Sequence, residues 1–331
     1  MIANPFLAGL TAAGTVSAEA YAEWGPFQPD RPAAWLEERY TNEASQFVEV
    51  DGARIHYRDE GPADAPTVLA VHGVYSSLHT WDGWVERLRD RVRVVRLTLP
   101  GFGLTGPRDG EHSLSTLVDT LAAFCDRLGL SNVAVAGNSL GGSLAWRLAV
   151  DRPDLVSKLL LLDAGGRTIL TREAAAMTRP GPSVVPRFFT PRSAVRLILK
   201  DGYGDPAKVT PQLVRRYHDL LLRTGNRRAV IELARSAREN GAAVTANGDE
   251  PEPWHQPDPA EVSVPTLVQW GREDEWLPVA YGRRLADAIP DATFRTYEGV
   301  GHVPMEEAPG VTSREAVVFL LGSSSPGLPH Q

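Results

Sequence analysis

The stretch "NVAVAGNSLGGSLAWRLAV" (residues 132–150) decides the fold. Its first part is a short apolar run, which is typical of a strand buried on both faces of a sheet. Its second part has helical spacing, and the two meet at Gly137-Asn138-Ser139-Leu140-Gly141, which fits G-x-S-x-G. Between a strand and a helix this pattern predicts a tight turn that exposes the serine hydroxyl. The alternative is a glycine-rich helix–strand contact in which Ser139 only caps the helix.

Short apolar runs and helical segments alternate on both sides of this stretch. Asp51-Gly52 between two alternating runs predicts a hairpin over 47–61. A helix is expected over 113–130, with Ser113 as its N-cap. Further strands are expected within 67–73, 92–103, 156–166, 264–274 and 292–302. Strands that alternate with helices predict an α/β fold, in which a mostly parallel central sheet is flanked by helices.

The domain organisation follows from one interval that breaks this alternation. Residues 164–262 begin and end with proline-rich segments and contain helical patterns between them. This interval is too long for a plain loop. We interpret 164–262 as a helical cap, or lid, inserted into a core made of 46–163 and 263–322. Residues 1–45 are expected to be an N-terminal extension, and 323–331 a flexible tail.

Composition and charge limit the classes of function. The chain has 331 residues, 43% hydrophobic and 23% charged, which is ordinary globular composition. The net charge of −7 argues against a nucleic-acid partner. Residues 164–240 nevertheless carry +9, so the remainder carries −16. The cap's helix faces either complement the acidic body or attract carboxylate-bearing esters or an anionic lipid surface.

The cysteine count and the beginning of the chain suggest a compartment. Cys125 is the only cysteine, which excludes an intrachain disulfide and a cysteine-rich metal site, and we expect it to be a small core residue. The apolar start "MIANPFLAGLTAAG" lacks a basic region, and Asn4 and Pro5 interrupt it. We therefore expect a soluble cytoplasmic protein with no metal or cofactor, and membrane contact stays a minor alternative.

A serine nucleophile needs a base within hydrogen-bonding reach and an acid that orients the base. The chain order that accompanies this turn is serine, acid, histidine, which leaves four downstream histidines. His218 and His255 fall in the expected cap, and His330 is the penultimate residue. His302 follows the last expected strand, so we predict that it is the general base.

The acid is expected directly after the strand "VPTLVQW", at Asp274. Glu273 and Glu275 are close enough to be mistaken for it. Asp163, at the end of the strand "LLLLD", is the second candidate, although a capping role at the entrance to the cap is the preferred interpretation of that residue.

Acyl transfer also needs hydrogen-bond donors for the oxyanion of the transition state. The backbone amide of Leu140, directly after the nucleophile, is one candidate. The second is the amide of Val74, which follows His72-Gly73 in the loop after an expected strand. His72 itself is expected to stiffen this loop.

With these residues in place, the sequence resembles the α/β-hydrolase superfamily. The segments "HYRDEGP", "HGVYSSLHTWDGW", "LPGFGLTGP", "AGNSLGG" and "GHVPMEE" are similar to those of bacterial family V esterases and lipases. Polyhydroxyalkanoate depolymerase-like proteins, enol-lactonases and C–C bond hydrolases are neighbours of that group. Thr98 departs from the pattern, because such proteins usually carry an aspartate there. Ser139 excludes the epoxide hydrolases and haloalkane dehalogenases of this fold, which use an aspartate at this position.

The resemblance implies a cofactor-free carboxylic-ester hydrolase that works through an acyl-enzyme on a small-molecule ester. Hydrolytic C–C cleavage or lactonase activity with the same triad is the first alternative, and a non-catalytic ligand receptor is the second. The substrate pocket is expected between body and cap. Residues near the predicted strand ends that either line this pocket or pack in the core are Trp81, Phe102, Leu104 and Trp276.

Overall fold

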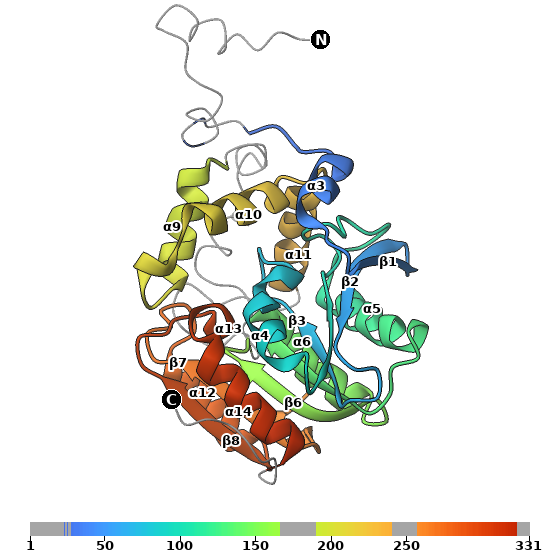
Figure 1. Ribbon diagram of the computed structural model, residues 1–331, viewed down its shortest axis with the longest axis vertical. Helices are drawn as coiled ribbons and strands as arrows, with labels where there is room; N and C mark the ends of the chain where they lie inside the picture. Colours follow the sequence, from blue (N-terminus) through green and yellow to red (C-terminus); the bar gives the residue numbers. More distant parts are fainter. Residues whose placement is uncertain (1–22, 24, 26–27, 166–189, 240–256, 323–331) are drawn as a thin grey trace, which may run out of the picture.

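A computed structural model describes residues 23, 25, 28–165, 190–239 and 257–322, and in them the strands form one eight-stranded sheet (Figure 1). The strands lie in the order β1-β2-β4-β3-β5-β6-β7-β8. β2 is antiparallel to both of its neighbours, and all pairs from β4 to β8 are parallel. The α/β fold with a mostly parallel sheet is thus confirmed. The strands are β1 (Ser45–Val50), β2 (Ala53–Glu60), β3 (Thr67–Val71), β4 (Arg93–Leu97), β5 (Val133–Asn138), β6 (Val156–Leu162), β7 (Thr266–Gly271) and β8 (Ala292–Tyr297).

The predicted hairpin joins β1 to β2 at Asp51 and Gly52. Both residues have positive φ, 47° and 73°, as a tight two-residue hairpin turn requires. The register pairs Val50 with Ala53 and Ser45 with Arg58. Asp51 and Gly52 therefore form the hairpin turn that the alternating runs around them predicted.

Helices cover both faces of the sheet and enclose two apolar cores. Because neighbouring residues of a strand point to opposite faces, Leu69 and Val68 of β3 belong to different cores. The first core is covered by α5 (Leu114–Arg127), α6 (Leu140–Asp151) and α12 (Val279–Ala288). The second is covered by α4 (Asp82–Leu88), α13 (Pro304–Glu307) and α14 (Pro309–Leu321).

The helix α5 begins where the sequence predicted. The Ser113 hydroxyl accepts a hydrogen bond from the Thr116 amide, and the Thr116 hydroxyl accepts one from the Ser113 amide, which forms a capping box. Cys125 lies on the buried face of this helix, and burial raises the pKa of its thiol to about 12. The cysteine is a core residue, as expected.

The described part of the expected cap contains three helices, α9 (Arg192–Gly202), α10 (Pro211–Leu221) and α11 (Asn226–Glu239). They follow β6 and precede β7 in the chain, and they lie together at one end of the sheet (Figure 1). Residues 166–189 and 240–256 of the expected cap lie outside the described residues, as does the expected tail. The domain boundaries therefore stay a prediction.

The described end of the N-terminal extension packs on this cap. Arg31 exchanges backbone hydrogen bonds with Leu222 and Thr224, just beyond α10. Helix α3 (Ala33–Tyr40) buries Leu36 completely against Leu104 and Leu220. Among the described helices, none is both long and apolar enough to cross a bilayer.

Candidate active site

Ser139 occupies the turn between β5 and α6. Its backbone has φ 52° and ψ −118°, which is a rare conformation for a residue with a side chain. A Cβ on Gly137 would lie 2.3 Å from the carbonyl oxygen of Gly141, and a Cβ on Gly141 would lie 2.2 Å from that of Val71. Only glycine fits these two positions, so the G-x-S-x-G pattern is a steric requirement of this turn.

The side chain of Ser139 has no structural partner in the helix that it precedes. Ser139 is partly exposed, whereas Asn138 and Leu140 on either side are buried. Its hydroxyl makes no capping hydrogen bond to α6, so the capping interpretation is wrong. The backbone of Ser139 is fixed instead, because its carbonyl oxygen accepts hydrogen bonds from the Ser143 and Gly165 amides at 3.1 and 2.9 Å.

His302 and Asp274 form a buried hydrogen-bonded pair beyond the ends of β8 and β7. Nδ1 of His302 lies 2.8 Å from Oδ2 of Asp274. The other oxygen, Oδ1, accepts hydrogen bonds from the Trp276 and Leu277 amides, both at 2.9 Å. A carboxylate bound to Nδ1–H leaves Nε2 as the basic nitrogen of the imidazole, which is the tautomer that a general base needs.

Asp274 is held in its ionised form. Burial alone would raise the pKa of this carboxyl, but His302 beside it and the hydrogen bonds that it accepts bring the pKa below its ordinary value. An ionised Asp274 can stabilise the imidazolium that forms when His302 takes up a proton.

Asn138 ties the His302 loop to the turn that carries Ser139. Its Nδ2 donates hydrogen bonds to the carbonyl oxygens of His302, at 2.9 Å, and Leu162, at 3.0 Å. The structure thus brings Ser139, His302 and the latter's partner Asp274 to the same edge of the sheet. Asn138 was missed in the sequence, where its place directly before Ser139 was the only available signal.

The other candidates for base and acid lie elsewhere. His218 is fully buried in α10 of the cap, and His255 and His330 lie outside the described residues. Glu273 and Glu275 are exposed, so neither replaces Asp274 as the partner of His302.

Among the described residues, Asp163 contacts β7 and Asp274, and not the entrance to the cap, where its preferred interpretation placed it. It follows β6 with φ 40°, is fully buried, and lies beside Asp274. Its Oδ1 accepts a hydrogen bond from the Gly271 amide at 3.0 Å. The reason is topological: β6 and β7 are parallel neighbours, so the residues that follow them meet at one edge of the sheet.

The loop after β3 lies against the Ser139 turn. A Cβ on Gly73 would come within 3.0 Å of the Ser139 Cβ. Val74 therefore follows a residue in contact with Ser139, and Leu140 begins α6 directly after it. Both backbone amides belong to segments next to the serine, and their oxyanion role stays a prediction.

His72 stiffens this loop through two hydrogen bonds of its ring. Its Nδ1 donates to the Gly73 carbonyl at 2.7 Å and its Nε2 accepts from the Leu99 amide at 3.0 Å, which requires a neutral ring. Burial lowers the pKa of His72 to about 4. Thr98, the departure noted above, accepts a hydrogen bond from the Leu78 amide at 3.2 Å.

Trp276 connects the predicted base to the cap. The centroids of its ring and the His302 ring are 4.8 Å apart, and its Nε1 donates to Oδ2 of Asp201 on α9 at 2.6 Å. Gly202, the last residue of α9, accepts a hydrogen bond from the His302 amide at 2.7 Å. Of the four residues expected near the pocket, Trp276 is the one in direct contact with His302.

The other three are buried in apolar clusters. Trp81 is fully buried against Trp84 in the second core, where it packs as a core residue. Phe102 meets the His72 ring edge-on at 5.4 Å between centroids. Leu104 lies in the small cluster under α3. These contacts match the core-packing alternative for all three.

Glu307 of α13 joins the His302 loop to the cap, and the sequence analysis missed it. Its Oε1 accepts from the Gly301 amide at 2.8 Å, and its Oε2 accepts from the Gly204 amide at 2.9 Å. Burial raises the pKa of Glu307 to about 7, although these hydrogen bonds act in the opposite direction. Its place in "GHVPMEE", five residues after His302, was the available signal.

Glu306 extends this junction to the loop after β3. Its carboxylate accepts from the hydroxyls of Tyr203, at 2.5 Å, and Tyr217, at 2.7 Å. The Tyr217 hydroxyl also lies 3.2 Å from the Ser76 hydroxyl. The cap is thereby hydrogen-bonded to both loops that flank Ser139.

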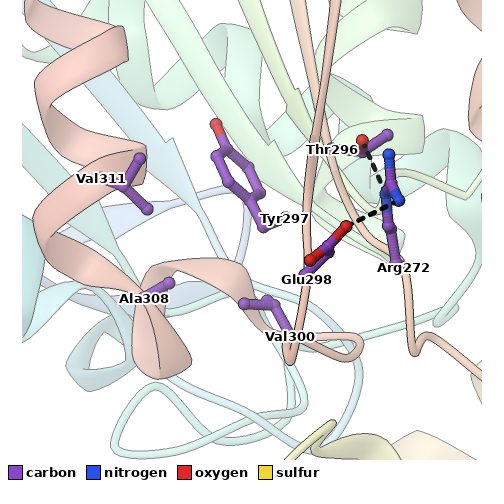
Figure 2. A pocket seen from close by; sticks show the side chains of 7 residues that line it. All are labelled: Arg272, Thr296, Tyr297, Glu298, Val300, Ala308 and Val311. Atoms are coloured by element: carbon purple, nitrogen blue, oxygen red, sulfur yellow. Dashed lines mark hydrogen bonds and ion pairs between the residues drawn. The ribbon is translucent and has the colours of Figure 1, made fainter.

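A cavity of about 380 Å³ lies at the β8 edge of the molecule. Figure 2 shows Arg272, Thr296 and Glu298 on one side of it and Ala308 and Val311 on the other. The Arg272 guanidinium is already paired with Glu298 at 3.0 Å and bonded to Thr296 at 3.2 Å. None of the predicted catalytic residues lines this cavity.

In the part of the chain that the structure describes, one group of side chains has the residue types of a metal site. Asp163, Asp274 and His302 place one oxygen or nitrogen atom each within 4.8 Å of one another. Nδ1 of His302 and both oxygens of Asp274 are engaged in hydrogen bonds. These hydrogen bonds already engage three of the atoms that a metal ion would bind.

Comparison with known proteins agrees with this geometry. The sequence model of the Alpha/beta hydrolase family matches residues 68–315. A 2-hydroxy-6-oxononadienedioate/2-hydroxy-6-oxononatrienedioate hydrolase of Cupriavidus pinatubonensis is 30% identical over 83% of this chain and 95% of its own length. A dihydrolipoyllysine-residue acetyltransferase component of the acetoin cleaving system of Cupriavidus necator is also 30% identical, over 80% of this chain, which spans 66% of that protein.

A solved structure extends the similarity to nearly the whole chain. It is a membrane phospholipase A, described as a bacterial virulence factor, with a TM-score of 0.66 and 26% identity. The match covers 97% of this chain and 99% of that protein.

Proposed function

The chain belongs to the alpha/beta hydrolase family, and from this premise we propose that it hydrolyses carboxylic esters through a serine nucleophile. The observation that carries the proposal is the buried Asp274–His302 pair, tied by Asn138 to the turn that exposes Ser139. The likeness to a phospholipase, whose substrates are esters, supports the choice of bond.

The reaction proceeds in two halves. The Ser139 Oγ attacks the ester carbonyl carbon while Nε2 of His302 takes the hydroxyl proton, and Asp274 stabilises the imidazolium. The Val74 and Leu140 amides bind the oxyanion. His302 then gives its proton to the leaving alcohol, which departs and leaves an acyl-serine. Water attacks this ester with His302 again as base, and the acid and free Ser139 are released.

A second candidate is hydrolytic C–C cleavage by the same triad. The relative from Cupriavidus pinatubonensis supports it, because that hydrolase is matched over 95% of its length and its name specifies an oxodienedioate substrate. Both reactions begin at a carbonyl carbon, so the triad geometry serves either.

The test compares wild type, Ser139→Ala and the surface control Ser157→Ala on p-nitrophenyl esters from acetate to long acyl chains and on 2-hydroxy-6-oxononadienedioate. We expect ester turnover by wild type and the control, and a loss of kcat/KM of at least about 10³-fold in Ser139→Ala. Turnover of the oxodienedioate alone would replace the proposal by the second candidate. Equal activity of Ser139→Ala and wild type would contradict both.

A further inference from the structure

Asp163 is a buried acid that the proposed mechanism does not use. It directly follows β6 in a left-handed conformation, φ 40°, and its side chain is shielded completely from solvent. The Gly271 amide lies 3.0 Å from its Oδ1 and 3.3 Å from its Oδ2. Its charged neighbours include the acids Asp274 and Glu307, which oppose a second negative charge. A buried carboxylate in these surroundings would be poorly stabilised.

A carboxylate oxygen of Asp163 and one of Asp274 lie within 4.8 Å of each other, and both side chains are buried. Two buried carboxylates this close repel each other strongly unless one of them carries a proton. Asp274 faces His302 and two backbone amides, all of which stabilise its negative charge. In the part of the chain that the structure describes, only the Gly271 amide donates to Asp163, and burial together with the charge of Asp274 raises its pKa well above the ordinary value. The proton therefore belongs to Asp163.

The topology also brings Asp163 close to the predicted base. The register pairs Leu162 of β6 with Gln269 of β7, so the residues beyond both strands approach the same imidazole. An oxygen of Asp163 and a nitrogen of His302 lie within 4.8 Å of each other. This separation is short enough for a small rearrangement to join them once Asp274 no longer carries a charge.

We propose that Asp163 is a neutral carboxylic acid that donates a hydrogen bond to Asp274, positions it, and replaces it as the partner of His302 when its charge is removed. In the intact protein Asp163 is a positioning residue, because it reaches the imidazole only through Asp274. The part of this inference that concerns catalysis rests on the proposed function. The protonation state of Asp163 does not.

The kinetic test is a double-mutant cycle on whichever ester or oxodienedioate the wild type turns over. Asp163→Asn keeps an uncharged side chain that can donate to Asp274, so we expect kcat within about threefold of wild type. Asp274→Asn is expected to cost about 10²-fold, less than the ~10⁴-fold of a triad left with no acid. The double variant should lose at least about tenfold more than Asp274→Asn. Thermal unfolding of each variant checks that it is folded.

Two kinetic results would overturn the inference. A loss of about 10³-fold or more in folded Asp163→Asn alone would mean that Asp163 is the ionised acid of the triad. Equal activities of Asp274→Asn and the double variant would mean that Asp163 cannot replace Asp274.

Infrared difference spectroscopy supplies a readout that needs no substrate. At pH 8 the wild type should show the carbonyl stretch of a protonated carboxylic acid that is missing in Asp163→Asn. Absence of this band from the difference spectrum would overturn the neutral state. A band that is present in a protein that hydrolyses neither substrate would instead count against the proposed function and leave the assignment of the proton intact.

Discussion

Ser139 combines a costly backbone conformation with a side chain that makes no capping hydrogen bond to α6. A residue with a side chain held at φ 52° and ψ −118° costs on the order of 1–3 kcal/mol. The turn persists because β5 and α6 on either side of it are buried and because amides bind the Ser139 carbonyl. The strained backbone therefore keeps the Ser139 hydroxyl accessible at the surface of the turn.

Asn138→Ala tests whether the link between the His302 loop and the Ser139 turn matters for catalysis. The variant leaves the His302 carbonyl without its donor and removes one of two donors from the Leu162 carbonyl, which the Ser139 amide also binds at 3.2 Å, so we expect a loss of about 1–3 kcal/mol in unfolding free energy. Because the lost bond also positions the base, kcat should fall about tenfold or more while KM changes little. Urea unfolding and steady-state kinetics measure the two effects.

Asn226→Ala is the matched control for that experiment. Asn226 is equally buried, and its Nδ2 also donates to two carbonyl oxygens, those of Gly103 and Leu220. It should cost a similar amount of stability and leave kcat nearly unchanged. If the two variants reduce kcat alike, the effect of Asn138 is one of general stability.

Among single residues, those that lie in a recognisable local pattern could be identified from the sequence. Ser139 is marked by its flanking glycines, and His302 by its place after the last strand. Asp163 could not be interpreted correctly, because its environment is made by Asp274, more than a hundred positions later. The same holds for Asn138, whose partner His302 lies 164 positions away.

Among the elements, the four-residue helix α13 has a large effect on the site for its size. Its two acids bind the His302 loop, the turn after α9, and two tyrosines from the cap segments. Position of the base and attachment of the cap thus depend on one short helix. Displacement of this helix would change both together.

Glu307→Gln should remove a pH dependence of stability. Burial raises the pKa of Glu307 in the folded protein from 4.5 to about 7, so the folded state binds the proton more tightly than the unfolded state. Its contribution is therefore fully present below pH 4.5 and is lost as the pH rises to 7, by up to about 3 kcal/mol. Urea unfolding from pH 4.5 to 8 should show a weaker decline in the variant than in wild type.

The exposed Glu298→Gln is the control for this titration, because the Glu298 side chain is 80% exposed. It should leave the pH dependence as in wild type. A Glu307→Gln profile parallel to that of wild type would mean that another group causes the decline.

Helix α3 is expected to stabilise the body through one residue. Leu36 is fully buried against Leu104 and Leu220, so Leu36→Ala should cost about 2–5 kcal/mol of unfolding free energy. Leu197 on α9 is 68% exposed, and Leu197→Ala should change stability by less than about 0.5 kcal/mol. Similar costs for the two variants would show that α3 contributes no burial in solution.

For the molecule as a whole, the charge of the cap is matched to its surroundings. Arginines of the cap pair with acids outside it: Arg196 with Glu23, Arg216 with Asp82, and Arg227 with Asp30. These contacts favour the interpretation that the basic helices complement an acidic body. They leave fewer free cations for steering an anionic substrate.

Salt should accordingly affect neutral and anionic esters alike. Between ionic strengths of ~0.05 and ~0.5 M, we expect kcat/KM for an anionic p-nitrophenyl ester and its neutral isostere to change by factors within about twofold of each other. The measurement is a salt series with both esters on the wild type. A much steeper loss for the anionic ester would instead support electrostatic steering by the cap.

The sheet, its flanking helices and the Asp51-Gly52 hairpin could be predicted because periodicity and turn chemistry are local. The docking of α3 on the cap could not, because residues 31–40 carry no clear periodicity and their contacts are made by α10 and by Leu104. The ion pairs of the cap could not be predicted for the same reason. Composition shows that the basic cap and the acidic remainder have opposite charges, but only the fold shows which side chains pair.

The insertion of the cap between β6 and β7 determines how the cap could be replaced by that of a related protein. These strands are parallel neighbours, with Leu159 opposite Thr266, so the inserted segment leaves the body at one end of the strand pair and re-enters it at the other end. The segment must span this distance, but beyond that its length can change without disturbing any strand pairing. A chimera that carries the segment of a relative should keep the Ser139 turn and the Asp274–His302 pair. Graft and host must agree where the cap meets the body, at Glu306 and Glu307, at Trp276 and at the His302 amide.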